Sequence, residues 1–151
     1  MIITSHIPVG GMPEDIIYDG TNLWVSIIMD AYWGSTGMLH KINPETMEIT
    51  DTYDTEIGPV EMVYQDGKIY LSHLYYDLNW VTYSGTSEFD IESGIINFSP
   101  YNSMDYTYLG ADIELINGDI YRTIHGMIDG NGIVKLDENL NAILESQIGN
   151  Y

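Results

Sequence analysis

Cysteine is missing from this chain, so neither a disulfide framework nor a thiolate metal site is available to it. Long apolar runs are missing as well, and no stretch approaches the length of a transmembrane helix. Residues 1–10 lack a basic start followed by an apolar core, which indicates that there is no signal peptide. We therefore expect a soluble protein, cytoplasmic or virion-associated, without a membrane partner.

Positive charge is almost as scarce as cysteine. The 151 residues include four Lys and Arg against 23 Asp and Glu, for a formal net charge of −19. A nucleic-acid binder needs a Lys/Arg patch that replaces phosphate counterions, so the composition argues against nucleic acid as a partner. It leaves open a solvated surface with acids in its turns, a cation site, or a basic protein partner.

Helical periodicity is also absent, because no segment carries a 3.6-residue apolar repeat, and this predicts an all-β chain. Short apolar and aromatic runs separated by turn residues predict strands instead. The expected strands after the first in each repeat are 23–29, 38–42 and 48–53, then 69–75, 88–91, 94–98 and 105–109 with a long loop after 75, and finally 120–124, 132–136 and 142–146.

One short pattern occurs three times, at 11–25, 58–71 and 110–121. Each copy has a Gly, an acid two or three residues later, an apolar stretch, an Asp-Gly or Asn-Gly turn, and an aromatic strand. A period of roughly 50 residues is typical of propellers and solenoids. Four short antiparallel strands per repeat predict β-propeller blades. Trp24, Tyr70 and Tyr121 hold equivalent strand positions, so we expect them between blades.

These repeats resemble the YVTN/NHL-like propeller repeats, the group that includes the streptogramin lyase propellers. The resemblance is carried by Gly-x-Pro-x-x-Ile-x-x-Asp-Gly-x-x-Leu-Trp-Val at 11–25 and Lys-Ile-Asn-Pro-Glu-Thr at 41–46, with weaker copies further along the chain. It implies a propeller of four-stranded blades. A streptogramin lyase would carry a catalytic His and a Glu-bound magnesium, but that arrangement has no residue-by-residue match here, so no activity is carried over.

Three blades are fewer than the roughly four to eight that close a propeller. We expect one domain over 1–151, with repeats at about 11–57, 58–109 and 110–151. An open arc leaves sheet edges exposed, and a homodimer would complete a six-bladed ring by two-fold symmetry. Residues 2–10 would then form a latch strand on the last blade of the neighbour. The alternatives are a compact three-bladed unit and an open array with capped edges.

Glu14, Glu61 and Asp112 are the acids of the three copies, at the start of each expected innermost strand. In a closed dimer they would form a ring of six carboxylates around the pore. Crowded carboxylates acquire raised pKa values or bind a cation, and oxygen ligands suit calcium or magnesium. The alternative is three solvated acids, and no cofactor is otherwise required.

The loops between second and third strands share one face of a propeller, and two of them are aromatic. We expect this face to bind a protein or a glycan, because Tyr and Trp supply large rigid contacts. The candidate ligand-binding residues are Tyr32, Trp33, Tyr75, Tyr76, Trp80 and Tyr83, with the acids Asp30, Asp77 and Asp129. The alternative is that several of these rings pack between blades.

Of the four histidines, His73 and His125 lie closest to this loop face, and they are the candidates for acid–base catalysis. His6 and His40 are expected to be structural or surface residues. No Ser/His/Asp arrangement and no P-loop is present.

Three functions remain from the sequence. The first is a non-enzymatic binding and assembly module, suited to a phage or viral accessory protein. The second is a metal-dependent lyase or hydrolase that acts on a small molecule at the pore mouth. The third is an acidic decoy for a basic protein.

Overall fold

The computed structural model describes residues 6–30, 34–98, 102–103, 107–126 and 132–143, and every regular element among them is a β-strand. The first sheet contains β1 (Met12–Tyr18), β2 (Leu23–Ile28), β3 (Gly37–Asn43) and β4 (Glu48–Asp54). The second contains β5 (Pro59–Gln65), β6 (Lys68–Tyr76), β7 (Thr82–Asp90) and β8 (Ile95–Phe98), with β9 (Asn102–Ser103) beside β7. The third contains β10 (Thr107–Ile116), β11 (Asp119–Gly126), β12 (Gly132–Leu136) and β13 (Ala142–Ile143).

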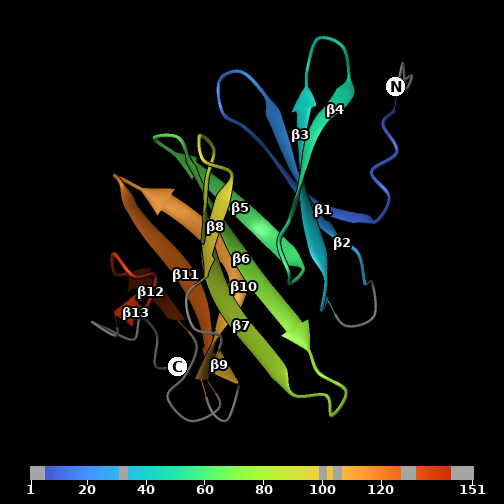
Figure 1. Cartoon of the computed structure of the whole chain (residues 1–151). Coiled ribbons are helices and arrows are strands. Elements are labelled where there is room, and N and C mark those ends of the chain that lie inside the picture. The colour runs from blue at the N-terminus through green and yellow to red at the C-terminus, as the bar shows by residue number, and fades with distance from the viewer. Residues whose placement is uncertain (1–5, 31–33, 99–101, 104–106, 127–131, 144–151) are drawn as a thin grey trace, which may run out of the picture.

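Each sheet is an antiparallel meander whose four main strands pair in sequence order. The first strands lie side by side, with β5 between β1 and β10, while the later strands of each sheet fan outward (Figure 1). This is the architecture of propeller blades, as the repeats predicted. We call the sheets blade one, two and three. The front face of a blade is turned toward the next blade in the chain, and its back face toward the preceding one.

The repeated turns form as predicted. Asp66-Gly67 and Asn117-Gly118 all have positive φ angles, between 48° and 89°, and they join β5 to β6 and β10 to β11. Such two-residue turns match the twist of a β-hairpin. In blade one the turn is longer, and the Asp19 carboxylate accepts the N–H groups of Thr21 and Asn22. The same carboxylate accepts the indole N–H of Trp24 at 2.7 Å, which fixes that ring toward blade two.

Blade two differs from the strands predicted for it. The segment expected to be a long loop after residue 75 is a hairpin, in which β7 pairs with β6 over nine residues. Residues 107–109, expected as the last strand of blade two, pair with β11 and belong to β10, so the repeat boundary near 109 falls inside a strand. The sequence did not predict the start of β7 because the run Ser84–Ser87 is polar and lacks the apolar alternation of a strand. Its Ser and Thr side chains are nevertheless buried.

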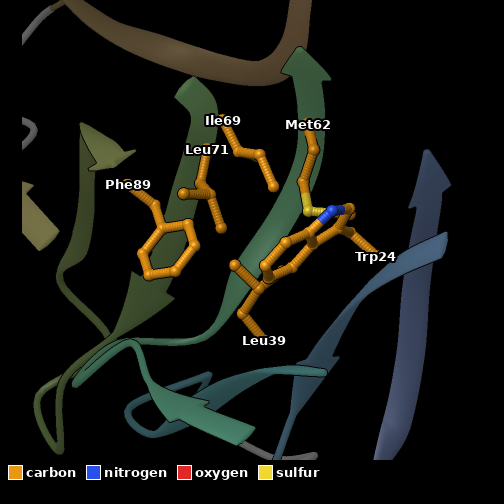
Figure 2. Close-up of a cluster of buried hydrophobic side chains, with 6 residues drawn as sticks. All are labelled: Trp24, Leu39, Met62, Ile69, Leu71 and Phe89. Carbon is orange, nitrogen blue, oxygen red and sulfur yellow. The ribbon is translucent and has the colours of Figure 1, made fainter. Parts of the chain in front are cut away.

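The junction between blades one and two is an aromatic core. Trp24 lies 5.4 Å from Phe89 in an edge-on arrangement, and Tyr53 lies 4.6 Å from Phe89, measured between ring centroids. Figure 2 shows the cluster of buried side chains, contributed by β2 and β3 on one side and by β5, β6 and β7 on the other. Its members are Trp24, Leu39, Met62, Ile69, Leu71 and Phe89. The prediction that Trp24 lies between blades is confirmed.

The junction between blades two and three combines an apolar cluster with a buried cation. Tyr70 and Val63 of blade two pack against a cluster centred on Ile113, Ile120 and Leu136 of blade three. This confirms the prediction for Tyr70. Beside the cluster, the guanidinium of Arg122 is 1% exposed and donates to the Gly85 carbonyl, the Thr86 hydroxyl and the Gly110 carbonyl.

Residues 6–11, which precede β1, form no strand, and the chain bends at Gly10 and Gly11. This segment lies against the back face of blade one. Ile7 and Val9 pack on a cluster of Val25, Ile27 and Ile42. The Nε2 of His40 donates to the Val9 carbonyl at 3.1 Å, while the Thr52 hydroxyl donates to Nδ1 at 2.9 Å. His40 is therefore structural, as predicted. The use of residues 2–10 as a latch on a neighbour stays a prediction.

Candidate functional site

The β6–β7 hairpin and the β2–β3 connection lie at the same end of blades one and two (Figure 1). After residues 31–33, which lie outside the described part, the β2–β3 connection continues at Gly34, whose φ angle is 63°. A Cβ at Gly34 would lie 3.1 Å from the Leu74 carbonyl oxygen and 3.5 Å from the Tyr75 Cβ. The Gly34 carbonyl also accepts the N–H of Gly58 at 2.7 Å. The β2–β3 loop is thus held against the end of β6.

The tip of the β6–β7 hairpin is built around one carboxylate. Asp77 accepts the backbone N–H groups of Asn79 and Val81 at 2.8 and 2.9 Å. The Val81 bond, together with that of Asn79, holds the pKa of Asp77 below its usual value although desolvation opposes it. Trp80 adopts a φ of 62°, a left-handed conformation that costs a residue other than glycine about 1 kcal/mol or more. The turn therefore has a defined shape.

This turn presents two large apolar side chains to solvent. Leu78 is 84% exposed and Trp80 is 73% exposed. Behind them, Tyr75 and Tyr83 stack across the hairpin with ring centroids 4.9 Å apart and an interplanar angle of 13°. Burial, together with the neighbouring Tyr83 and Asp77, raises the pKa of the Tyr75 phenol. The hairpin is a rigid stem with an apolar tip.

The structure brings together only part of the predicted loop face. Tyr75, Tyr76, Trp80, Tyr83 and Asp77 lie on this hairpin, with Tyr76 exposed and Tyr83 half-buried. Asp30 starts the neighbouring loop and accepts the Ser35 hydroxyl at 2.8 Å. Tyr32, Trp33 and Asp129 lie outside the described residues, and so does the side chain of His125. Leu78 was not among the predicted residues because it is aliphatic, although its place directly after Asp77 in an Asx turn favours exposure.

A second arrangement involves the carboxylates of the innermost strands. Asp15 on β1 accepts the Met62 N–H of β5 at 2.8 Å. Glu61 on β5 accepts the Ile113 N–H of β10 at 3.2 Å. We call this contact, from a carboxylate to an N–H of the next blade, the interblade hydrogen bond. It accounts for the acids of the first two repeats without invoking a ligand.

The predicted alignment of these acids is wrong by one residue in blade one. The N–H groups of Asp15 and Glu61 donate to equivalent hydroxyls, those of Ser26 and Ser72, at 3.0 and 2.9 Å. The equivalent of Glu61 is therefore Asp15, and the strand registers give Asp112 as the third member. Glu14 is displaced because the pairing of β1 with β2 shifts between Pro13 and Asp15, and its side chain is exposed.

Charge accumulates along these strands. Burial raises the pKa of Glu61; the Ile113 N–H lowers it, and the nearby Asp112 and Asp15 raise it further. Desolvation lowers the pKa of Arg122 to about 10, although the charges of Glu61 and Asp112 oppose that change. Arg122 is thus a cation at neutral pH. Its positive charge offsets part of the negative charge of Glu61 and Asp112.

His73 is sealed inside blade two rather than placed on the loop face. It is fully buried, and its Nε2 lies 2.7 Å from the Ser87 hydroxyl. Desolvation and the charge of Arg122 lower its pKa to about 3, so the imidazole is neutral under ordinary conditions. Proton exchange with a substrate in solvent is not available to a side chain in this position. The geometry therefore gives no support to the predicted acid–base role of His73.

The side chains of the described residues form no metal site. No group of three or more His, Asp or Glu side chains in this part of the chain is arranged to hold a metal ion. The calcium or magnesium site predicted for a closed carboxylate ring stays a prediction. The same residues contain no helix long and apolar enough to cross a membrane.

Comparison with solved structures gives a distant likeness. No family model matches the chain, and no curated protein matches it. Among solved structures, it is similar to a GH43 endo-arabinanase from Bacillus licheniformis, with 18% sequence identity and a TM-score of 0.44. The match covers 86% of this chain and 55% of the arabinanase, so the chain spans about half the length of that protein. A likeness this distant carries no argument about activity.

Proposed function

We propose that the chain is a non-enzymatic binding module that recognises a protein or a glycan through its β6–β7 hairpin. The observation that carries this proposal is the exposure of Leu78 and Trp80 on a turn whose backbone is fixed by Asp77. Apolar side chains on a rigid turn lose little entropy on binding, and aromatic anchors dominate the free energy of association. The motifs at 11–25 and 41–46 keep a YVTN/NHL-like repeat as our family hypothesis.

The acids beside the hairpin favour particular partners. A chain with a net charge of −19 repels acidic surfaces and attracts basic ones at moderate salt. An indole face also stacks on the apolar face of a sugar ring or accepts a cation from Lys or Arg. We therefore propose a neutral glycan or a basic protein segment as the partner.

The test is binding of the wild-type chain to a glycan array and to a displayed peptide library, followed by variants. Trp80→Ala and Leu78→Ala should each weaken binding by about tenfold or more. Ile95→Ala is the matched control, because Ile95 is similarly exposed but lies on β8, the outer strand of blade two. Its affinity should not change. Equal losses for Ile95→Ala and Trp80→Ala, or no binding to either library, would contradict the proposal.

The two other predicted functions have their own tests. A metal-dependent lyase or hydrolase requires that calcium or magnesium raises the melting temperature and that a chelator reverses the rise. An acidic decoy requires binding to a basic protein that weakens steeply with salt. The hairpin module should show no metal-dependent stabilisation, and salt should weaken its binding to a basic segment only moderately, because its affinity depends mainly on apolar contact.

A further inference from the structure

The back face of blade one repeats a surface that is buried in the other two blades. Ile16, Met62 and Ile113 hold equivalent positions on β1, β5 and β10. Met62 and Ile113 are each 4% exposed because a preceding blade covers them, whereas Ile16 is 58% exposed. Blade one is the outermost of the three described sheets on the N-terminal side (Figure 1). Position in the arc, rather than residue type, accounts for the difference.

The whole back face of blade one has the composition of an interblade surface. In blade two, the side chains turned toward blade one are Met62, Tyr64, Ile69, Leu71, Phe89 and Ile96. The strand registers give their equivalents in blade one as Ile16, Tyr18, Leu23, Val25, Ile42 and Ile49. All six equivalents are apolar or aromatic. A sheet face that is exposed to solvent carries mostly polar residues at such positions.

The interblade hydrogen bond is incomplete at both ends of the arc. Met62 and Ile113 donate their N–H groups to an acid of the preceding blade. The equivalent Ile16 N–H donates instead to its own neighbour, Asp15, at 2.7 Å. At the other end, Asp112 is the equivalent of Asp15 and Glu61 and is exposed, and no further blade packs on blade three within the described residues. One end therefore carries a donor, and the other carries the matching acceptor.

A buried hydroxyl on blade three also lacks a partner among the described residues, although its equivalent in blade two, Ser72, donates to the Glu61 carbonyl of its own blade at 3.3 Å. Ser26 of blade one donates to the Val60 carbonyl at the start of blade two, at 2.9 Å. The strand registers make Thr123 the equivalent of Ser26. Its Oγ1 is buried and has no hydrogen-bond partner within the described part of the chain. A buried hydroxyl without a partner costs free energy, so a carbonyl supplied by a further blade would be stabilising.

We infer that the back face of blade one binds the front face of blade three from a second copy of this chain. Tyr121 of that copy, equivalent to Trp24 and Tyr70, would enter the apolar face, and Asp112 would accept the Ile16 N–H. Two-fold symmetry makes the same contact twice and closes a six-bladed ring. The partner is another copy because its blade three carries the missing half of each contact.

This docking requires the N-terminal segment to move. Ile7 and Val9 cover part of the face, near Val25 and Ile42, but leave Ile16 and Tyr18 open. The segment thus competes with the second copy for the same surface. Ile7→Asp weakens its apolar contact and should strengthen association, whereas a segment that belongs permanently to this face would leave association unchanged or weaken it.

The main experiment measures mass by sedimentation equilibrium over a range of concentrations. The wild-type chain should approach the mass of two chains. Ile16→Glu should raise the dissociation constant of the dimer by at least about 100-fold, because it buries an unpaired charge. Ile95→Glu is the control: Ile95 is 57% exposed on β8, and its substitution should change the constant by no more than about twofold.

A mixing experiment tests the direction of the contact. Ile133 lies on the front face of blade three and is 50% exposed, so Ile133→Glu should also prevent dimer formation. A mixture of the Ile16→Glu and Ile133→Glu chains keeps one intact interface and should associate, although neither chain does so alone. A wild-type monomer at all concentrations would overturn the inference, as would a mixture that stays monomeric. Trp80→Ala should leave the mass unchanged, so failure here is separable from failure of the proposed function.

Discussion

The two junctions between blades share one hydrogen bond and differ in what fills the space beside it. In both, a carboxylate of the innermost strand accepts an N–H of the next blade. In the first junction the strand position held by Leu71 is apolar, and aromatic rings surround it. In the second junction the equivalent position is Arg122, whose charge is satisfied by blade two. The interblade hydrogen bond is common to both junctions, whereas the side chains that fill the space beside it differ.

This difference separates geometry from stability. The interblade hydrogen bond depends on strand position and recurs wherever two blades meet. The filling of the first junction should contribute more to stability than the hydrogen bond, because buried aromatic side chains dominate core energetics. Arg122 also places a cation beneath Glu61 and Asp112, which the apolar junction does not require. We therefore expect substitutions in the filling to be costlier than those in the hydrogen bond.

The largest effect is expected at the aromatic junction. Trp24→Ala removes a fully buried ring and the indole bond to Asp19, and should lower the free energy of unfolding by about 3–5 kcal/mol. Ile95→Ala, an exposed aliphatic substitution on the same fold, should cost less than about 0.5 kcal/mol. Denaturant unfolding followed by circular dichroism measures both. A loss below 1 kcal/mol for Trp24→Ala would show that this junction is not packed as described.

The next effect is expected at the junction that contains the buried cation. Arg122→Ala leaves the Gly85 carbonyl and the Thr86 hydroxyl without their donor, and should cost about 3 kcal/mol. Arg122→Met fills the space with an apolar chain, which makes this junction resemble the first. It should cost clearly less than the alanine variant. Equal losses for the two variants would mean that the charge, rather than the volume, holds blade three.

Removing the interblade hydrogen bond should have a smaller effect. Asp15→Ala takes away the acceptor of the Met62 N–H and should cost about 2 kcal/mol. Asp15→Asn keeps a carbonyl oxygen in place and should restore much of that loss. Glu14→Ala, at the exposed neighbouring position, is the second control. If Glu14→Ala were as damaging as Asp15→Ala in thermal melts, the corrected alignment would fail.

The smallest effect concerns the charge on Glu61. Its pKa is raised in the folded chain, so the ionised carboxylate destabilises the fold at neutral pH, and acidification through the folded pKa toward the unfolded value relieves this. Glu61→Gln should therefore melt slightly higher than wild type at neutral pH, with a difference that shrinks on acidification. Asp77→Asn should show the opposite sign, because the pKa of Asp77 is lowered. Differences independent of pH would contradict both assignments.

The sequence was sufficient for the repeats and their turns. The Asp-Gly and Asn-Gly pairs and the Trp24 and Tyr70 positions are local signals, and the structure confirms them. Glu14 was chosen over Asp15 because a shift in strand pairing moves the register by one residue, and spacing alone does not reveal it.

The candidate site was predicted only in part. Trp80 and Tyr75 are aromatic and could be found by composition, whereas Leu78 became apparent only when its exposure was known. Burial of His73 and Arg122 depends on acceptors from strands distant in the sequence, such as Ser87 and Gly85. Such partners are set by tertiary packing and have no local signature.

Asp112 is the third copy of the acid that accepts the interblade hydrogen bond, and no N–H of a further blade reaches it within the described residues. The most direct test is the dimer dissociation constant of Asp112→Ala, measured beside Asp112→Asn. We predict that the constant rises about tenfold for the alanine variant and recovers in the asparagine variant. At low concentration, where the chain is monomeric, Asp112→Ala should melt at the wild-type temperature, whereas Asp15→Ala should melt lower. An unchanged constant, or a loss of monomer stability equal to that of Asp15→Ala, would contradict the account.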